Sequence, residues 1–146
     1  MDEGLQTTGA QMQEAMRRLL HHHVRALSPP EEDADLTRAQ AATLVQIGKD
    51  GPLSMGSLSE ALTISPGSLT GVVDRLIEKG FVRRERGRTD RRRVVVRLTE
   101  EGEKAYARHR ESAARFSEAL MALLTPEEGK TLLRLIQKLV DGLEGA

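Results

Sequence analysis

The spacing of the apolar residues changes at residue 81, and this change constrains the fold more than any other feature of the chain. Between residues 57 and 80, apolar side chains recur at helical spacing in two short stretches. Between residues 81 and 98 they alternate with polar ones, as in half-buried β-strands. Two short helices followed directly by a β-hairpin predict a helix-turn-helix with a wing.

The two short helices are separated by a tight turn at Thr63 and Ile64. The second helix begins with Ser65 as its N-cap and Pro66 in its first position, and Gly80 ends it. The apolar face of the first helix is expected to consist of Leu58, Ala61 and Leu62. The inner side of the second helix is expected to consist of Leu69, Val72, Val73, Leu76 and Ile77.

The hairpin is expected to have strands at 81–85 and 93–98, with turn residues at 87–90. In the second strand, the alternation places Val94, Val96 and Leu98 on one face. Arg93 and Arg97 then lie on the opposite face. The wing is therefore predicted to have one apolar and one basic side.

The flanking segments are helical in pattern. Residues 5–27 form one long predicted helix, and the proline-containing acidic segment 28–35 forms a loop. A capping box at Thr37 and Gln40 starts a helix with Leu44, Val45 and Ile47 buried, which ends over residues 48–52.

Two more helices are expected after the hairpin. Thr99, followed by two glutamates, caps a helix running to about residue 124. Thr125 and Glu128 form a second capping box, with Pro126 in the first helical position.

Both terminal helices carry apolar stripes that exceed what an exposed helix face needs. The stripes consist of Met12, Met16, Leu19, Leu20, Val24 and Leu27 at one end and of Leu132, Leu133, Leu135, Ile136, Leu139, Val140 and Leu143 at the other. They predict a homodimer interface, although packing on their own domain is the alternative. The expected organisation is one compact, mainly α domain: a dimerisation helix and loop at 1–35, a winged helix-turn-helix lobe at 36–98, and C-terminal dimerisation helices at 99–146.

The composition excludes several classes of protein. The absence of cysteine excludes disulfides, thiolate nucleophiles and cysteine zinc sites, and only three aromatic residues are present to stack on single-stranded bases. No apolar run is long enough to span a membrane and no signal peptide is visible, so a cytoplasmic protein is expected. No catalytic motif is found, so neither an enzyme nor a cofactor is expected.

The net charge of zero conceals a strong segregation of charge. Residues 75–97 carry ten basic and three acidic side chains, a net charge of +7, which the other residues balance with 12 basic and 19 acidic ones. Nine of the ten basic residues are arginines, and Arg88, Arg91, Arg92 and Arg93 crowd the hairpin tip. Arginine forms bidentate contacts with phosphate, so double-stranded DNA is the expected partner.

The second short helix is the candidate recognition helix. Its outward positions carry short side chains and glycines, so readout is expected to depend on DNA shape and on the wing arginines. The predicted DNA-binding residues of the helix are Ser65, Pro66, Gly67, Ser68, Thr70, Gly71 and Arg75. Those of the wing are Arg86, Arg88, Asp90, Arg91, Arg92 and Arg93.

Seven segments together resemble the MarR family of bacterial transcriptional regulators. They are LTRAQ at 36–40, SLSEAL at 57–62, residues 65–70, VDRL at 73–76, EKGFV at 78–82, DRR at 90–92 and LTEEG at 98–102. The resemblance spans residues 36–102, and the flanking helices fit the dimerisation elements of the family by position and pattern. It implies a homodimer whose recognition helices enter major grooves and whose wings contact minor grooves.

The resemblance also assigns individual roles. It makes Arg92 the wing-tip arginine of the minor groove, held by Asp90 through a carboxylate–guanidinium contact. Two-fold symmetry implies a pseudo-palindromic operator with half-sites about 10 bp apart. Members of the family commonly respond to small aromatic or phenolic acids, so a repressor released by such an effector is expected. The pattern does not identify the ligand-binding residues, and the absence of cysteine excludes oxidant sensing through a thiol.

Two alternatives remain at this point. His21, His22 and His23 raise the possibility of a metal-responsive regulator, but consecutive helical residues point about 100° apart and cannot share one ion. One of them could bind metal with His109 or a glutamate across a dimer, respond to pH, or simply lie at the edge of the apolar stripe. The other alternative is a winged-helix protein-interaction module without a DNA function.

Overall fold

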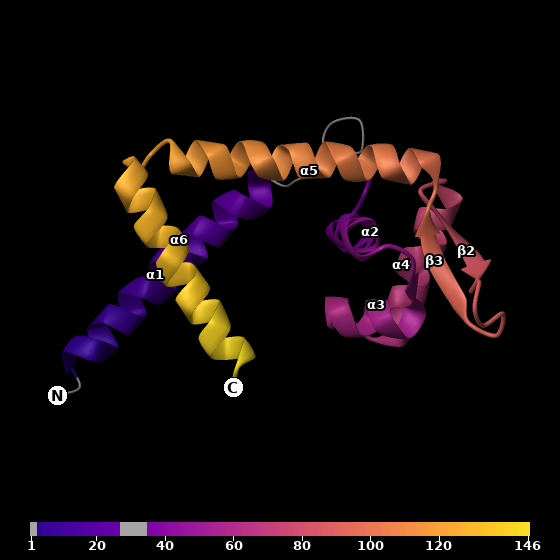
Figure 1. The fold of residues 1–146 in the computed structure, drawn as a ribbon, viewed down its shortest axis with the longest axis horizontal. Coiled ribbons are helices and arrows are strands. Elements are labelled where there is room, and N and C mark those ends of the chain that lie inside the picture. The colour runs from indigo at the N-terminus through magenta and orange to yellow at the C-terminus, as the bar shows by residue number, and fades with distance from the viewer. Residues whose placement is uncertain (1–2, 27–34) are drawn as a thin grey trace. The chain divides into compact units, whose positions relative to one another are not determined.

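The computed structural model describes residues 3–26 and 35–146, and side chains from residue 7 onward (Figure 1). Its elements are α1 (Glu3–Ala26), α2 (Arg38–Asp50), β1 (Leu53–Ser54), α3 (Met55–Leu62), α4 (Pro66–Glu78), β2 (Val82–Arg86), β3 (Val94–Leu98), α5 (Glu100–Met121) and α6 (Pro126–Glu144). The chain divides into two compact units, 1–112 and 113–146. The predicted class, mainly helical with a small β wing, is confirmed. Of the predicted loop 28–35, only Asp35 lies within the described residues.

The sheet has one strand more than the predicted hairpin. Its antiparallel order is β1-β3-β2, with Val82 opposite Leu98 and Arg86 opposite Val94 in the hairpin. The short strand β1 pairs Leu53 with Val96. Two residues are too few to show an alternating pattern, so no sequence pattern indicates β1. The two hairpin strands begin one residue later than expected.

The core of the first unit is formed where α2, α3 and α4 pack on the sheet. Leu44, Leu58, Leu69, Leu76 and Val96 are among its fully buried side chains. Figure 1 shows α3 and α4 adjacent to each other and α4 next to the wing strands. This packing holds the second helix of the helix-turn-helix in place by its apolar face.

Two expected apolar positions are exposed instead. Ala61 is exposed on α3, where Leu58 is buried and Leu62 only partly buried. Val94 was expected to share the buried face of Val96 and Leu98, but its side chain is 45% exposed. Val94 pairs with Arg86 at the end of the hairpin next to the turn, beyond the part of the sheet that the helices cover.

The predicted helix caps are confirmed. Thr37 and Thr125 each form a capping box, and the Ser65 side chain accepts a hydrogen bond from the N–H of Ser68 with Pro66 in the first turn. Gly80 follows α4 with a φ of +81°, a conformation that glycine adopts without strain. Helix α5 ends at Met121, slightly before the expected position.

The start of α5 is tied to the junction between α4 and β2. The hydroxyl of Thr99 donates to the carbonyl of Gly80 at 2.5 Å and accepts from the N–H of Gly102 at 3.1 Å. Gly102 is buried so close to the Phe81 carbonyl that a Cβ would overlap it. The end of the recognition helix, the first wing strand and α5 therefore meet at one compact point.

The terminal helices expose their apolar stripes within the described chain. Met12, Met16, Leu19 and Leu20 of α1 are exposed, and so are Leu133, Leu139 and Leu143 of α6, the last at 80%. Among the described residues, no helix is long and apolar enough to cross a membrane.

Candidate nucleic-acid interface

The recognition helix α4 presents one apolar and one polar side, as the sequence predicts. Leu69, Val73 and Leu76 are completely buried, whereas Val72 and Ile77 are half-buried at the edges. The predicted interface residues on the other side are all exposed: Ser65, Pro66, Gly67, Ser68, Thr70, Gly71 and Arg75. The helix thus offers a continuous exposed surface of small side chains ending in one arginine.

The hydroxyl groups on this surface are not equivalent. The Ser65 and Ser68 hydroxyls share a hydrogen bond of 2.9 Å, and the Thr70 hydroxyl donates to the Pro66 carbonyl at 2.9 Å. Because either hydroxyl of the Ser65–Ser68 pair can be the donor, one of the two keeps its proton for an outside acceptor. Thr70 would first have to give up its bond within the helix. The Ser65–Ser68 pair is accordingly better placed than Thr70 to donate toward a phosphate or base edge.

The arginines near the base of the wing are paired with carboxylates. Arg84 contacts Asp74 of α4 at 2.8 Å, which ties β2 to the recognition helix. Arg83 and Arg97 lie directly opposite each other on β2 and β3, where two like charges repel. Glu85 contacts both, at 2.7 Å each. Hydrogen bonds from Arg97 and Arg83 hold the pKa of the Glu85 carboxyl below its usual value.

The arginines near the tip differ in having no carboxylate partner among the described residues. Five are exposed and form no ion pair with the part of the chain that the structure describes: Arg86, Arg88, Arg91, Arg92 and Arg93. On α4, Arg75 is paired with Glu78 at 3.1 Å, an exposed contact between neighbouring turns. The uncompensated positive charge of the interface is therefore concentrated on the wing tip.

The wing turn is held by backbone contacts. The N–H of Gly87 donates to the Arg93 carbonyl at 2.7 Å, and the N–H of Arg93 donates to the Asp90 carbonyl at 3.1 Å. The Asp90 carboxylate accepts the backbone N–H of Arg92 at 3.0 Å. The expected contact with the Arg92 guanidinium is thus replaced by an Asx turn, because an aspartate readily reaches the N–H two residues ahead. Asp90 orders the tip, on which Arg92 is exposed.

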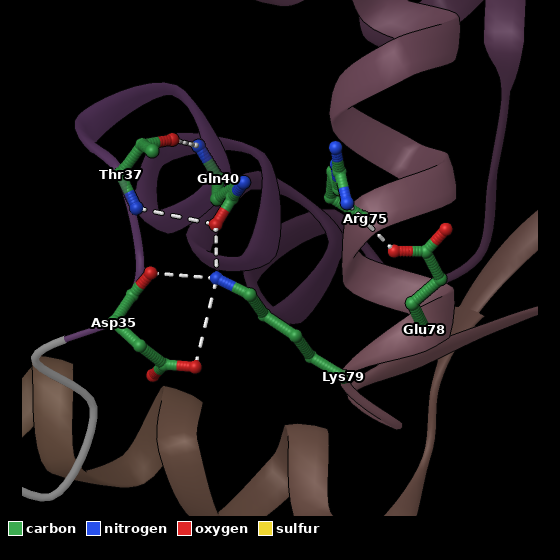
Figure 2. A network of polar contacts seen from close by, with 6 residues as sticks. All are labelled: Asp35, Thr37, Gln40, Arg75, Glu78 and Lys79. Atoms are coloured by element: carbon green, nitrogen blue, oxygen red, sulfur yellow. Dashed lines mark hydrogen bonds and ion pairs between the residues drawn. The ribbon is translucent and has the colours of Figure 1, made fainter.

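One polar residue that the sequence did not single out lies at the other end of α4. Lys79, the C-cap residue, contacts Asp35 and Gln40 near the start of α2 (Figure 2). These partners are 44 and 39 residues away in the chain, so no local spacing could reveal the contact. In the sequence, Lys79 was only one of the ten basic residues of segment 75–97.

The histidines do not form a metal site within the described chain. His21 and His22 are exposed, with their rings in edge-to-face contact at 5.9 Å, and His109 is buried on α5. Residues 3–26 and 35–146 contain no group of three or more histidine, aspartate or glutamate side chains that could hold a metal ion. The metal-responsive alternative therefore gains no support from these residues.

Comparison with known proteins agrees with this geometry. The family model for the MarR family matches residues 36–94. The transcriptional repressor NicR of Pseudomonas putida is 30% identical over 131 residues, which are 90% of this chain and 83% of NicR. The structure is also similar to the crystal structure of the reduced form of MarR from E. coli. The match covers 86% of this chain and 93% of MarR, with 28% identity and a TM-score of 0.72.

A third similar protein has been solved with nucleic acid. Streptococcus pneumoniae FabT, in complex with DNA, matches 97% of this chain and 98% of its own with a TM-score of 0.78 and 22% identity. At that identity the likeness shows the fold. The match to the family model, the identity with NicR over most of both chains and the common fold lead to one conclusion: the chain belongs to the MarR family and is a transcriptional regulator of the winged-helix type, not an enzyme.

Proposed function

We propose that the chain is a homodimeric regulator that binds a pseudo-palindromic double-stranded DNA operator through α4 and the wing. The observation that carries the proposal is the group of five exposed wing arginines without a carboxylate partner in the described chain. The FabT complex supports it, because a protein of the same fold has been solved with DNA.

The distribution of ion pairs separates two roles for the arginines. Those at the wing base neutralise carboxylates and hold the strands and α4 together. Those at the tip repel one another, and phosphate groups of a duplex would remove that repulsion. Arg92 is exposed on the ordered Asx turn, so we assign it the minor-groove contact.

The glycines of α4 favour a close approach of the helix to the duplex. A Cβ at Gly67 or Gly71 would meet no other atom within 4 Å, so neither glycine is required by packing within the chain. Each costs a helix about 1 kcal/mol relative to alanine. The two glycines lie four residues apart on the exposed side, where their missing side chains let backbone come close to DNA.

The homodimer is supported by the exposed apolar surfaces of the terminal helices. In the second unit, α6 and the end of α5 line a groove of about 540 Å³. Its lining includes Met121, Leu132, Leu133 and Ile136. Monomeric proteins rarely expose such continuous apolar surface. We assign this surface and the stripe of α1 to contacts with a second copy of the chain.

We further propose that the protein is a repressor released by a small aromatic or phenolic acid. Two points support this proposal: the resemblance to a family whose members commonly respond to such acids, and the 30% identity with a protein named as a transcriptional repressor. Release would follow if the acid bound more tightly to a dimer whose lobes no longer match the operator spacing.

The primary experiment is the selection of genomic fragments by the purified protein, followed by affinity measurements on the operator duplex it yields. Replacing Arg92 with alanine should lower operator affinity by about 1–3 kcal/mol, the magnitude of one good arginine contact. A plot of the logarithm of the binding constant against the logarithm of the salt concentration should also become less steep. Its slope should fall by about 0.9 for each phosphate that is no longer neutralised. Arg83→Ala is the matched control: it removes the same charge from an arginine paired with Glu85 and should have the smaller effect. Equal effects of the two substitutions would contradict the assignment.

Replacing Gly67 and Gly71 with alanine should separate stability from function. Each substitution should raise the free energy of unfolding by up to about 1 kcal/mol, measured by urea denaturation. Both should weaken operator binding, because a methyl group then stands between the helix and the duplex. Gly142→Ala, an open helical position on α6, should give the gain in stability alone. Undiminished operator affinity of the double variant would show that the duplex does not approach these glycines.

The dimer can be tested with one charge on α6. Leu139 is exposed in the single chain, so Leu139→Asp should change the stability of the isolated chain little, within about 0.5 kcal/mol. It should shift the mass measured by analytical ultracentrifugation from dimer toward monomer, because a carboxylate would be buried in the interface. Lys138→Asp on the same helix is the control and should remain dimeric. A monomeric parent protein would refute the proposal.

The effector is testable with a panel of small aromatic and phenolic acids. A compound that binds at 100 times its Kd should stabilise the fold by about 2.7 kcal/mol and raise the thermal midpoint. The same compound should weaken operator binding, by about 5- to 150-fold for an ordinary allosteric coupling. Aliphatic acids of equal charge serve as controls. A panel without any compound that produces both changes would contradict release by an aromatic acid.

A further inference from the structure

The Lys79 ammonium is bound within the lobe, whereas the arginines of the wing tip are exposed. The Lys79 side chain is 24% exposed, and its ammonium lies among three oxygen atoms (Figure 2). The Asp35 carbonyl lies at 2.6 Å, Gln40 Oε1 at 2.9 Å and Asp35 Oδ2 at 3.6 Å. Two of the three N–H donors of the ammonium are therefore used in hydrogen bonds, and the Asp35 carboxylate adds an ion pair. Most of the charge of Lys79 is therefore directed at these groups within the lobe and not at the solvent.

The side-chain amide oxygen of Gln40 accepts two hydrogen bonds. It accepts the backbone N–H of Thr37 at 3.2 Å, which is one half of the capping box of α2, and it accepts Lys79 Nζ at 2.9 Å. The other half of the box is the bond from the N–H of Gln40 to the Thr37 hydroxyl. Gln40 is only 7% exposed, so its oxygen needs partners within the protein. The start of α2 and the end of α4 are thereby joined through one polar cluster.

Lys79 lies where the recognition helix ends and the path to the wing begins. Its backbone N–H donates to the Arg75 carbonyl at 3.0 Å, and β2 begins three residues later at Val82. Lys79 therefore lies at the junction of the two elements that are proposed to bind DNA. Asp35, on the other side of the contact, lies three residues before α2, in the segment that joins α1 to α2 in the sequence.

We propose that Lys79 is a positioning residue for operator recognition. By tying the C-terminal end of α4 to the N-terminal end of α2, it fixes the direction in which the recognition helix and the wing approach the duplex, and it does so without contacting DNA. This inference depends on the proposed DNA-binding function. Arg75, one turn earlier on α4, is the contrasting residue: it is 68% exposed and pairs only with Glu78 in the described chain.

The fold of the lobe does not depend on this contact. The helix is anchored by Leu69, Val73 and Leu76, which are completely buried and do not involve Lys79. Without the ammonium, Gln40 still accepts the N–H of Thr37, so the capping box remains. Removing the ammonium should therefore change how well α4 is oriented, while the lobe stays folded.

The test compares Lys79→Met with Arg75→Met, which removes the same charge from the same helix. Affinities are measured for the selected operator and for an unrelated duplex over a range of salt concentrations, well below the thermal midpoint. Lys79→Met should lower operator affinity about 3- to 30-fold, the usual size of a positioning effect, with the salt slope and the affinity for unrelated DNA unchanged. Arg75→Met should lower both affinities and reduce the slope. Lys79→Arg, which keeps the donors, should restore operator affinity at least in part.

Three results would overturn the inference. Operator affinity equal to that of the parent protein would exclude a positioning role, and a reduced salt slope in Lys79→Met would make Lys79 a direct phosphate contact. An equal reduction of affinity for both duplexes would mark a general effect on the fold. If Lys79→Met is partly unfolded at the assay temperature, Lys79→Gln removes the charge, keeps a donor, and faces the same criteria. A parent protein without salt-dependent duplex binding would overturn the proposed function itself, whereas an unaltered Lys79→Met overturns only the positioning role.

Discussion

The burial of one face of α4 is the interaction on which the rest of the structure depends. Leu69, Val73 and Leu76 are completely buried against α2, α3 and the sheet, and each such side chain contributes about 1.5–3 kcal/mol. Because this face is fixed, the opposite face must be exposed, and it carries small residues. The same packing places the end of the helix where the wing begins. The packing of the core thus determines which face of α4 belongs to the candidate interface.

The charged residues of the wing are likewise divided into those near the core and those near the exposed tip. Near the core, arginines are neutralised by Asp74 and Glu85, which hold the wing strands to each other and to α4. Farther out, the turn is ordered by backbone contacts around Asp90, and its arginines remain without carboxylate partners in the described chain. A net charge of zero therefore coexists with a strongly basic edge. This segregation favours one orientation on a polyanion over indiscriminate binding.

Local patterns predicted what is encoded locally. The capping boxes at Thr37 and Thr125, the proline start of α4 and the change to an alternating pattern at the wing each involve residues close in the chain, and all are found in the structure. The two-residue strand β1 and the exposure of Val94 depend on what a distant segment covers. The contact of Lys79 with Asp35 and Gln40 joins residues about 40 positions apart. The Asx turn at Asp90 was missed because the family resemblance assigned its carboxylate to a side chain instead of a backbone N–H.

The proposed homodimer would explain both the small side chains of α4 and the exposed apolar stripes of the terminal helices. A recognition surface of serines, a threonine and glycines offers few long side chains for base contacts, so one lobe alone would bind DNA weakly. Joining two lobes makes the second contact intramolecular and can raise the overall affinity by about 10²–10⁴ without new base contacts. The gain requires that both lobes match the half-site spacing at the same time. A change in that spacing would then remove most of the affinity, as the proposed release by an effector requires. In the proposed homodimer, the geometry of the pair would therefore control binding.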